Sequence, residues 1–491
     1  MLAALALLPS AVVIVVVLGL RGSGLMAAAA ALATTSLLWA MQIFGPFSLD
    51  QLGRAAADAG VLTSLVAAMV VPGILFVEAT RGRKSPEAIG ALVGAIGLPK
   101  AQSAILIAVG IGVMVESLTG MGVSLLVTMP LLLGLLDKRA AIGIGLIGMS
   151  LMPWGALAIS AHVGAGLSGI PVEHLQKYIV AVSGPVAFFL PLLCLLLVPE
   201  RRVLDVAVAG LAGVVLVAGI GFGTAWIGIE VAGVAGGLAV IGLLAALARS
   251  RAGLGKALAA PGLVPYWTLL AAVIVVKLAF KPLAEAGFSP AIETQRVRFL
   301  LLTSPGVALL AATLLSEGRR VDADLLMRVA ARGWRPVVTV SVFMLAARLL
   351  VECGGITTLL TQIWGAGEIT TAVIVAGLGA LGGFVTGSGV TSNALFMDFA
   401  VSALPPVKMP PWLSTHVKAL AALQNGAGGH TAMASLPVAA ILLATLPHRE
   451  RGDDRSVMLT GLALAAWHLL VATAAAIILL TGPTPWLHSL W

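Results

Sequence analysis

Charged residues are scarce in this sequence of 491 residues. They make up 10% of it, whereas hydrophobic residues make up 59%. A soluble protein carries about a quarter charged residues, so the sequence leaves no room for a large soluble domain or a soluble ATPase domain. No Walker A phosphate-binding pattern occurs in it. Cysteine is rarer still: Cys194 and Cys353 lie in or beside apolar runs, so neither a disulfide framework nor a cysteine metal motif is readable.

The formal charge of +8 comes from cations in short loops between apolar runs, where such cations set the orientation of membrane helices. We therefore expect no nucleic-acid partner, and we expect neither a cofactor nor a bound metal. The mean hydropathy is +1.07, and apolar runs of about 18 residues or more, long enough to cross the hydrocarbon of a bilayer, recur along the chain. A membrane barrel would show short alternating segments instead. The sequence predicts an all-α polytopic membrane protein surrounded by lipid.

The apolar runs predict about 12 transmembrane helices. The first lacks cations before its apolar core, so we interpret it as a span and not as a cleaved signal. The expected spans lie near 2–20, 25–45, 60–79, 141–165, 178–198, 203–219, 230–248, 262–281, 299–316, 336–352, 412–446 and 457–481.

Two apolar segments, 101–136 and 370–404, remain unassigned. Each is about 35 residues long with a glycine-rich polar centre, whereas one span needs about 20 residues. Each segment is either two spans or a re-entrant hairpin, which enters and leaves the membrane on one side. Two hairpins, with the N-terminus outside, place most of the 29 Lys and Arg residues in the cytoplasm, as the positive-inside rule requires. This favours hairpins.

The chain also predicts an inverted repeat. In each half, a span ending in a similar stretch ("ILFVEATRG" or "RLLVECGG") leads to a hairpin, then to a long apolar segment with a break ("MPWG" or "QNGAGG"), then to a final span. Inverted repeats with broken helices are a recurring plan of secondary transporters. The expected divisions are two N-terminal spans in 1–49, a first repeat in 50–200, linking spans in 201–320 and a second repeat in 321–484.

The hairpin tips and the helix breaks are the expected substrate site. Non-helical backbone is tolerated at membrane depth where it is buried in protein or lines a water-filled cavity. Free N–H groups at the start of a half-helix attract an anion. The alternative is that these small residues only let helices pack closely, and a packed core tryptophan is the alternative for Trp154. The candidate substrate-binding residues are Ser117, Thr119, Gly120, Gly122, Trp154, Gly155, Thr386, Gly387, Ser388, Thr391, Ser392, Asn393, Asn425, Gly426 and Thr431.

Ionisable residues inside the spans are candidates for coupling. Glu116 is the first candidate proton carrier, because removal from water favours the neutral form of a carboxyl group. His430 is the second, because imidazole titrates near neutrality. Arg348 and Glu352 stand four residues apart, a spacing that permits a local ion pair, and Lys277 has the alternative of reaching the membrane interface.

Three stretches resemble the bacterial lactate permease family, whose members carry lactate and glycolate with protons. They are "ESLTGMGVSLLVTMPLLLGLLDK" from Glu116, "FVTGSGVTSNALF" from Phe384 and "GAGGHTAMASLPVAAI" from Gly426. The chain departs from the family pattern at Gly389, where the family has an aspartate, and at Met433, where it has a lysine; His430 replaces a small apolar residue. The resemblance implies an elevator-like carrier with two re-entrant hairpins, here as a divergent member.

We therefore expect a multi-pass carrier in a bacterial cytoplasmic membrane, and not an enzyme with catalytic residues. Its expected substrate is a small monocarboxylate such as L-lactate or glycolate, in symport with protons. Sodium coupling with another small organic anion stays open, as does a homodimer. A channel would need a continuous polar stripe along several helices, and an intramembrane hydrolase, suggested by "TGSG", lacks the usual serine motif.

Overall fold

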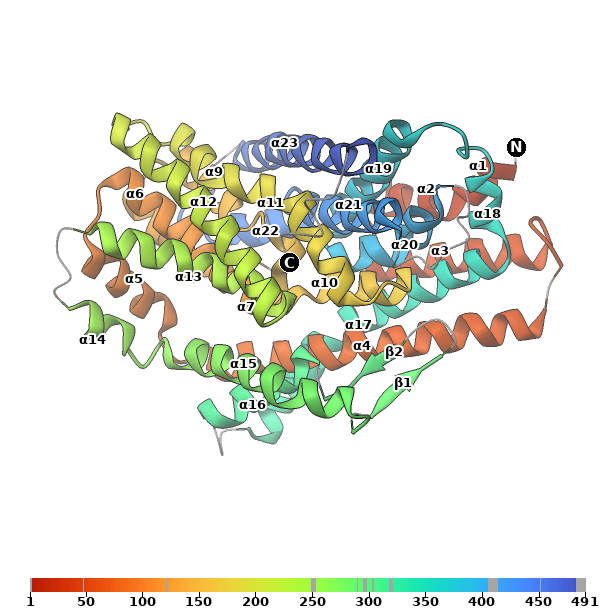
Figure 1. The fold of residues 1–491 in the computed structure, drawn as a ribbon, viewed down its shortest axis with the longest axis horizontal. Helices are drawn as coiled ribbons and strands as arrows, with labels where there is room; N and C mark the ends of the chain where they lie inside the picture. The colour runs from red at the N-terminus through yellow and green to blue at the C-terminus, as the bar shows by residue number, and fades with distance from the viewer. Residues whose placement is uncertain are drawn as a thin grey trace.

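The computed structural model describes residues 2–46, 48–120, 122–248, 253–288, 290–294, 298–302, 304–317, 321–404, 414–450 and 452–482. Within these ranges the protein is all-α, and 83% of it is helical. The sheet that these ranges contain is a short antiparallel ribbon of β1 (Ala291–Glu293) and β2 (Arg298–Leu300), in which Ile292 pairs with Phe299. Most helices run side by side along the long axis of the molecule (Figure 1).

Long apolar helices make this a multi-pass membrane protein. A helix pairs its backbone N–H and C=O groups internally, which the hydrocarbon of a bilayer demands. Among the described residues nine helices are long and apolar enough to cross a membrane, or up to ten when the bent pair α9 and α10 is counted as one span. They are α4 (Leu49–Thr80), Lys100–Thr119, α11 (Val172–Leu197), α12 (Val203–Trp226), α13 (Ile229–Leu247), α17 (Ala323–Glu352), α19 (Glu368–Thr386), Thr415–Ala444 and α23 (Asp453–Thr481).

Two of these segments are divided. Lys100–Thr119 consists of α6 (Lys100–Ile105), η2 (Leu106–Gly112) and α7 (Val113–Thr119), and Thr415–Ala444 consists of α21 (Thr415–Ala432) and α22 (Leu436–Ala444). The other helices are α1 (Leu2–Ala6), α2 (Leu8–Ile14), η1 (Val15–Gly19), α3 (Gly24–Ala40), α5 (Ser85–Ile96), α8 (Val123–Leu135), α9 (Lys138–Gly148), η3 (Met152–Trp154), α10 (Gly155–Ser168), α14 (Leu254–Leu258), α15 (Val264–Glu285), α16 (Pro305–Glu317), α18 (Gly355–Leu360) and α20 (Gly389–Ser402).

The expected spans near 2–20, 25–45 and 299–316 fall on helices shorter than a full span. Residues 2–19 form α1, α2 and η1, α3 has 17 residues and α16 has 13. The number of long apolar helices in the described ranges is therefore below the expected 12 or so. Parts of the predicted segments lie outside the described residues: residue 121 of the segment 101–136, residues 303 and 412–413 of expected spans, and residues 405–413, 451 and 483–484 of the second repeat.

Each unassigned segment forms two packed helices joined by a glycine turn. In the first, α7 ends at Thr119, Gly120 and Gly122 have φ of 67° and 77°, and α8 runs back along η2. In the second, α19 ends at Thr386, Gly387 has φ of 69°, and α20 packs against α19. Positive φ is accessible to glycine at little cost, so the glycines noted in the sequence do form the two turns.

The expected helix break at "MPWG" is present. Helices α9 and α10 are bent by 42° around η3. Helix α10 opens with a left-handed turn in which Ala156, Leu157 and Ala158 have φ of 48°, 55° and 58°.

The second break was predicted too early: "QNGAGG" at 424–429 lies within the continuous helix α21, and the break comes at 433–435. Helix α21 ends at Ala432, and α22 begins after Ser435, whose hydroxyl accepts the Val438 N–H at 3.4 Å. The glycines of 424–429 serve close packing instead, since a Cβ on Gly428 would lie 2.5 Å from Ser392 Oγ.

Helices α4, α15, α16 and α17 form a separate layer, which we call the long-helix bundle. They lie along the lower side of Figure 1, while α19 to α23 lie along its upper side, with α7 and α10 between the two. Ion pairs fasten the bundle: Arg332 of α17 pairs with Glu78 of α4, and Arg83 Nε lies 2.6 Å from Glu317 Oε1 at the end of α16.

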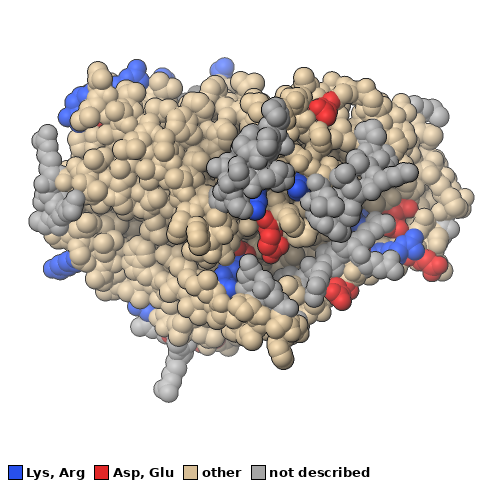
Figure 2. Space-filling view, in the orientation of Figure 1, with Lys and Arg blue, Asp and Glu red and all other residues tan. Residues whose placement is uncertain are grey.

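The surface fits a membrane environment. On the face drawn in Figure 2 the charged side chains gather near the left and right ends and around the centre, with broad uncharged areas between them. Because charge is costly in hydrocarbon, we expect these uncharged areas to face lipid.

Candidate functional site

The glycine turns of the two helix pairs, which we call the first tip (around Gly120) and the second tip (around Gly387), meet both helix breaks at one cavity of about 660 Å³. One wall of the cavity is formed by the first tip, the second tip, the start of α10 and the start of α22. The residues of this wall are Glu116, Leu118, Thr119, Gly120, Met149, Met152, Gly155, Ala156, Ile159, Ser160, Thr386, Gly387, Ser388, Gly389, Val390, Thr391, Pro437, Val438 and Ile441.

The opposite wall is formed mainly by the long-helix bundle. Helix α4 contributes the stretch from Val66 to Gly73, α16 contributes Leu309, and α17 contributes the stretch from Trp334 to Val340; the start of α3 completes the wall. The cavity therefore lies at the boundary between the hairpins and the bundle. A boundary of this kind can shift when one part moves against the other.

Helix N-termini converge on the cavity. The first residues of α3 and α20 line it, and their unpaired N–H groups carry partial positive charge. The start of α22 also lines it but offers no free N–H there, because Pro437 lacks one and the Val438 N–H is bound to Ser435 Oγ. At α20, the Ser388 hydroxyl already accepts the Thr391 N–H at 3.3 Å, so the preceding N–H groups remain for a ligand. The C-terminal ends of α7 and α19, at Thr119 and Thr386, line the same cavity with partial negative charge. The cavity thus offers places for an anion and for a cation.

Glu116 makes the first tip different from the second. Its carboxylate accepts the Gly122 N–H at 3.2 Å and the Ser124 hydroxyl at 2.6 Å, so it fills the N-terminus of α8. The residue is 1% exposed and lines the cavity. An anion of the chain itself therefore takes the position that the sequence assigned to a substrate carboxylate at this tip.

Arg335 is the second charged residue among those that line the cavity. It is exposed, and its guanidinium lies 5.4 Å from the centre of the Trp334 ring, a cation–π distance. Arg335 was not among the predicted site residues, because it belongs to a run of cations that indicates how the membrane helices are oriented. The only available signal was the adjacent Pro336, which marks this turn of α17 as irregular.

Several predicted site residues lie behind the cavity wall and join helices. Asn393 Nδ2 donates to Ser160 O and to Asn425 Oδ1, both at 2.8 Å, which ties α20 to α10 and α21. Ser392 Oγ donates to Gly379 O at 2.8 Å, and Thr431 Oγ1 donates to Ala380 O at 3.0 Å. These side chains position the second tip. Gly426 is also absent from the lining and packs beside Ser183.

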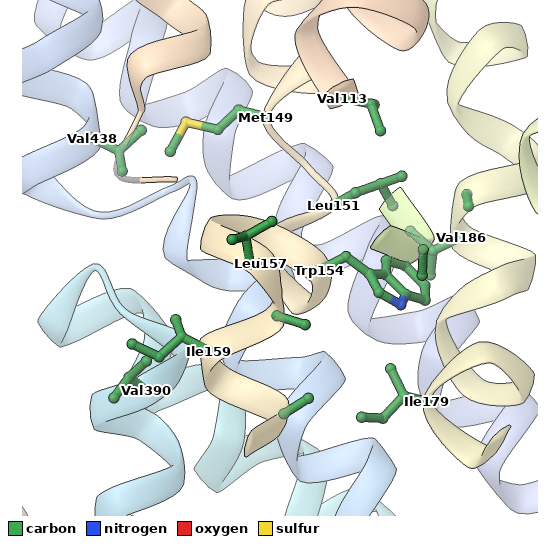
Figure 3. Close-up of a cluster of buried hydrophobic side chains, with 14 of the residues drawn as sticks. Val113, Met149, Leu151, Trp154, Leu157, Ile159, Ile179, Val186, Val390 and Val438 are labelled. Carbon is green, nitrogen blue, oxygen red and sulfur yellow. The ribbon is translucent and has the colours of Figure 1, made fainter. Parts of the chain in front are cut away.

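His430 and Trp154 are fully buried away from the cavity lining. His430 Nδ1 lies 2.9 Å from Ser150 O, and its ring is 5.5 Å from that of His468. Figure 3 shows the Trp154 ring directed toward Val186 and away from Ile159 and Val390. Trp154 therefore has the packing position that was the alternative to a substrate contact.

Ser117 and Gly122, from the first tip, are likewise absent from the cavity lining. Ser117 packs against Gly233 of α13, and the Gly122 N–H is bound to Glu116. Of the predicted site residues, those that line the cavity are Glu116, Thr119, Gly120, Gly155, Thr386, Gly387, Ser388 and Thr391.

The ionisable residues within the spans have partners outside their own helices. Arg348 binds Asp58 of α4 at 2.6 Å and Asp398 of α20 at 2.8 Å, while Glu352 binds Arg54 at 3.1 Å. The local ion pair between Arg348 and Glu352 that their spacing permits is therefore not the main interaction of either residue.

Lys277 also turns inward. Its Nζ lies 2.5 Å from Glu230 Oε1, and His162 Nε2 lies 2.8 Å from the same oxygen. The side chain of Lys277 is 15% exposed. The alternative interpretation, in which Lys277 reaches the membrane interface, was therefore wrong. A partner with 1% side-chain exposure on another helix satisfies its charge instead.

Comparison with known proteins adds no assignment. No protein-family model matches this sequence, and no curated protein is significantly similar to it.

Proposed function

We propose that this chain is a secondary active carrier of a small monocarboxylate, such as L-lactate or glycolate, in the cytoplasmic membrane of a bacterium. The single observation that supports it best is the cavity in which both tips meet the N-termini of α3 and α20 and Arg335. Its volume of about 660 Å³ lies within the range of small-molecule sites, about 300–1,000 Å³. The apolar side chains of the cavity, such as Val390 and Ile159, suit the carbon end of such a substrate.

The transport cycle in this proposal follows the inverted repeat. The two helix pairs, α7 with α8 and α19 with α20, are re-entrant hairpins that enter from opposite sides of the membrane, and they move together against the long-helix bundle as in an elevator. The position of the cavity between these two parts supports this plan. The chain is then a divergent member of the lactate permease family, an assignment that rests on the three sequence stretches described above.

Proton coupling in this proposal depends on Glu116. While ionised, Glu116 fills the N-terminus of α8 and repels a second carboxylate from the first tip. A proton on Glu116 removes that repulsion, so proton and substrate anion bind together. Sodium coupling has its own supporting observation: the C-terminal ends of α7 and α19 line the cavity, and the backbone carbonyls of such helix ends can coordinate a cation.

Uptake into proteoliposomes tests the proposal. The purified protein is given a panel of labelled small carboxylates, with proton and sodium gradients imposed separately. We expect saturable uptake of a two- or three-carbon monocarboxylate, accelerated by an inward proton gradient. Acceleration by sodium alone would select the alternative coupling. Flux that never saturates would indicate a channel, and the absence of uptake for every carboxylate would refute the assignment.

Arg335 gives a sharper test of the anion site. We expect Arg335→Gln to raise KM about tenfold at low salt and less at high salt, because an exposed cation at a cavity collects anions through a screened field. kcat should change little. Arg328→Gln is the matched control: Arg328 lies two turns earlier on α17, is exposed and does not line the cavity. Equal KM effects of the two substitutions would show that Arg335 has no specific part.

A further inference from the structure

A buried ion cluster joins α20 to the long-helix bundle. The Arg348 guanidinium of α17 binds Asp58 of α4 at 2.6 Å and Asp398 of α20 at 2.8 Å. The side chains of Arg348 and Asp58 are 2% and 6% exposed, and that of Asp398 is 16% exposed. Ions at such depth are costly unless they are paired.

The cluster lies in line with the cavity. Asp398 follows the lining residue Thr391 by seven residues, or two turns, on the same face of α20 and about 10 Å further along it. On α4, Asp58 precedes the lining residue Met69 by eleven residues, or three turns. The lining stripes of both helices therefore continue from the cavity to this cluster.

Helix α17 shows on which side of the cavity the ion cluster lies. Arg335, at the cavity, precedes Arg348 by thirteen residues, or about 20 Å of helix. Arg335 lines the cavity and is exposed, whereas Arg348 is buried and lies eight residues beyond Val340, the last residue of α17 that lines the cavity. The ion cluster therefore lies beyond the end of the cavity that is away from Arg335.

The two arms of the cluster have different mechanical consequences. The Arg348–Asp58 pair lies inside the long-helix bundle and can persist through any movement of the hairpins. The Arg348–Asp398 pair crosses from the bundle to the second hairpin, so α20 cannot slide along α17 without breaking it. Asp58 continues to neutralise Arg348 after that break, which lowers the cost of leaving a charge buried.

We propose that the Arg348–Asp398 ion pair is a gate: it closes the end of the cavity away from Arg335, and it opens when α20 moves relative to α4 and α17. This proposal rests on the proposed carrier function in one respect: transport is the reason why the cavity would need a gate. The gate itself concerns access of water-borne reagents to the cavity, and its test needs no substrate.

Labelling of a cysteine in the cavity tests the gate. Val390→Cys, in a full-length chain that also carries Cys194→Ala and Cys353→Ala, is exposed to a membrane-impermeant thiol reagent from each side of the membrane. We expect faster labelling from the Arg335 side. Adding Asp398→Asn should raise the labelling rate from the far side about tenfold or more, because a charge-assisted bond that holds the end closed is lost.

The matched control is Glu352→Gln, which removes an ion pair one turn further along α17 and should leave the far-side rate unchanged. If Asp398→Asn does not fold, Arg348→Lys replaces it, because a lysine ammonium lacks the planar fork that spans two carboxylates, and the same increase is expected. An unchanged far-side rate in the variant that folds overturns the gate. Failure of all carboxylate uptake with an increased far-side rate would overturn the proposed substrate and leave the gate in place.

Discussion

We expect uptake driven by a pH gradient to be lost in Glu116→Gln, while exchange of substrate at equal pH on both sides should continue. The glutamine amide keeps the shape of the side chain and an oxygen that can accept the Gly122 N–H, so the first tip should keep its turn. It cannot take up and release a proton. Net uphill transport requires that proton movement, whereas exchange of one substrate molecule for another does not.

The measurement is uptake of a labelled monocarboxylate into proteoliposomes, with and without an inward proton gradient. We expect gradient-driven accumulation to fall to the level of passive equilibration. Glu368→Gln is the control: Glu368 opens α19 and pairs with His416 at 3.0 Å, and its side chain is 40% exposed. Full accumulation by Glu116→Gln would remove Glu116 from the coupling step and leave His430 as the remaining candidate.

The long helices and the two helix–turn–helix segments could be predicted because the membrane imposes a length. A segment of 101–136 is too long for one span and has glycines at its centre, and it does turn at Gly120 and Gly122. The same reasoning overestimated short apolar runs such as 2–20, where the helix divides at Leu7, just before Pro9, and leaves Leu8–Gly19 as a shorter apolar helix. Hydropathy records that a run is apolar, and does not record whether it stays helical for its full length.

Ion pairs could not be predicted from spacing. Arg348 and Asp58 are 290 residues apart in sequence, and the geometry that joins them arises only when α4 packs on α17. The sequence could suggest only a pair between Arg348 and Glu352, because these two residues lie within one helix. Lys277 and Glu230 show the same limit, because the partner of a lone charge in an apolar run lies on another helix.

The candidate site was predicted in part for a related reason. The tips and the first break were located, and the second break was predicted a few residues too early, at 424–429 instead of 433–435. The residues that face the cavity also depend on the rotation of each half-helix. On α20, Ser388 and Thr391 line the cavity, whereas Ser392 and Asn393 face α19, α10 and α21. Neighbouring residues on a helix point about 100° apart, so a cluster of polar residues in the sequence divides between the cavity and the packing behind it.

The turn of the first hairpin should tolerate only glycine at position 120. Gly120 has φ of 67° and ψ of −167°, a region that is essentially restricted to glycine and costs about 1–3 kcal/mol for other residues. A Cβ added there would lie 2.6 Å from the Ala156 Cβ and 3.1 Å from the Ala156 nitrogen. Overpacking of this kind costs a further 1–3 kcal/mol or so. We expect Gly120→Ala to lower stability by roughly 2–6 kcal/mol and to abolish uptake.

Thermal unfolding in detergent and uptake in proteoliposomes measure the two effects. Gly134→Ala is the matched control, because Gly134 lies within α8 with no atom within 4 Å of an added Cβ. That substitution should leave uptake intact and stability equal or slightly higher, since alanine is the better helix former.

Adding Ala156→Gly to Gly120→Ala separates the cost of the collision from the cost of the backbone conformation at residue 120. Ala156 has φ of 48°, so a glycine there fits its backbone and also removes the methyl group that collides. The double variant should recover the part of stability lost to the collision and not the part lost to the backbone of residue 120. Unimpaired stability and uptake in Gly120→Ala alone would show that the first tip has another conformation from the one described.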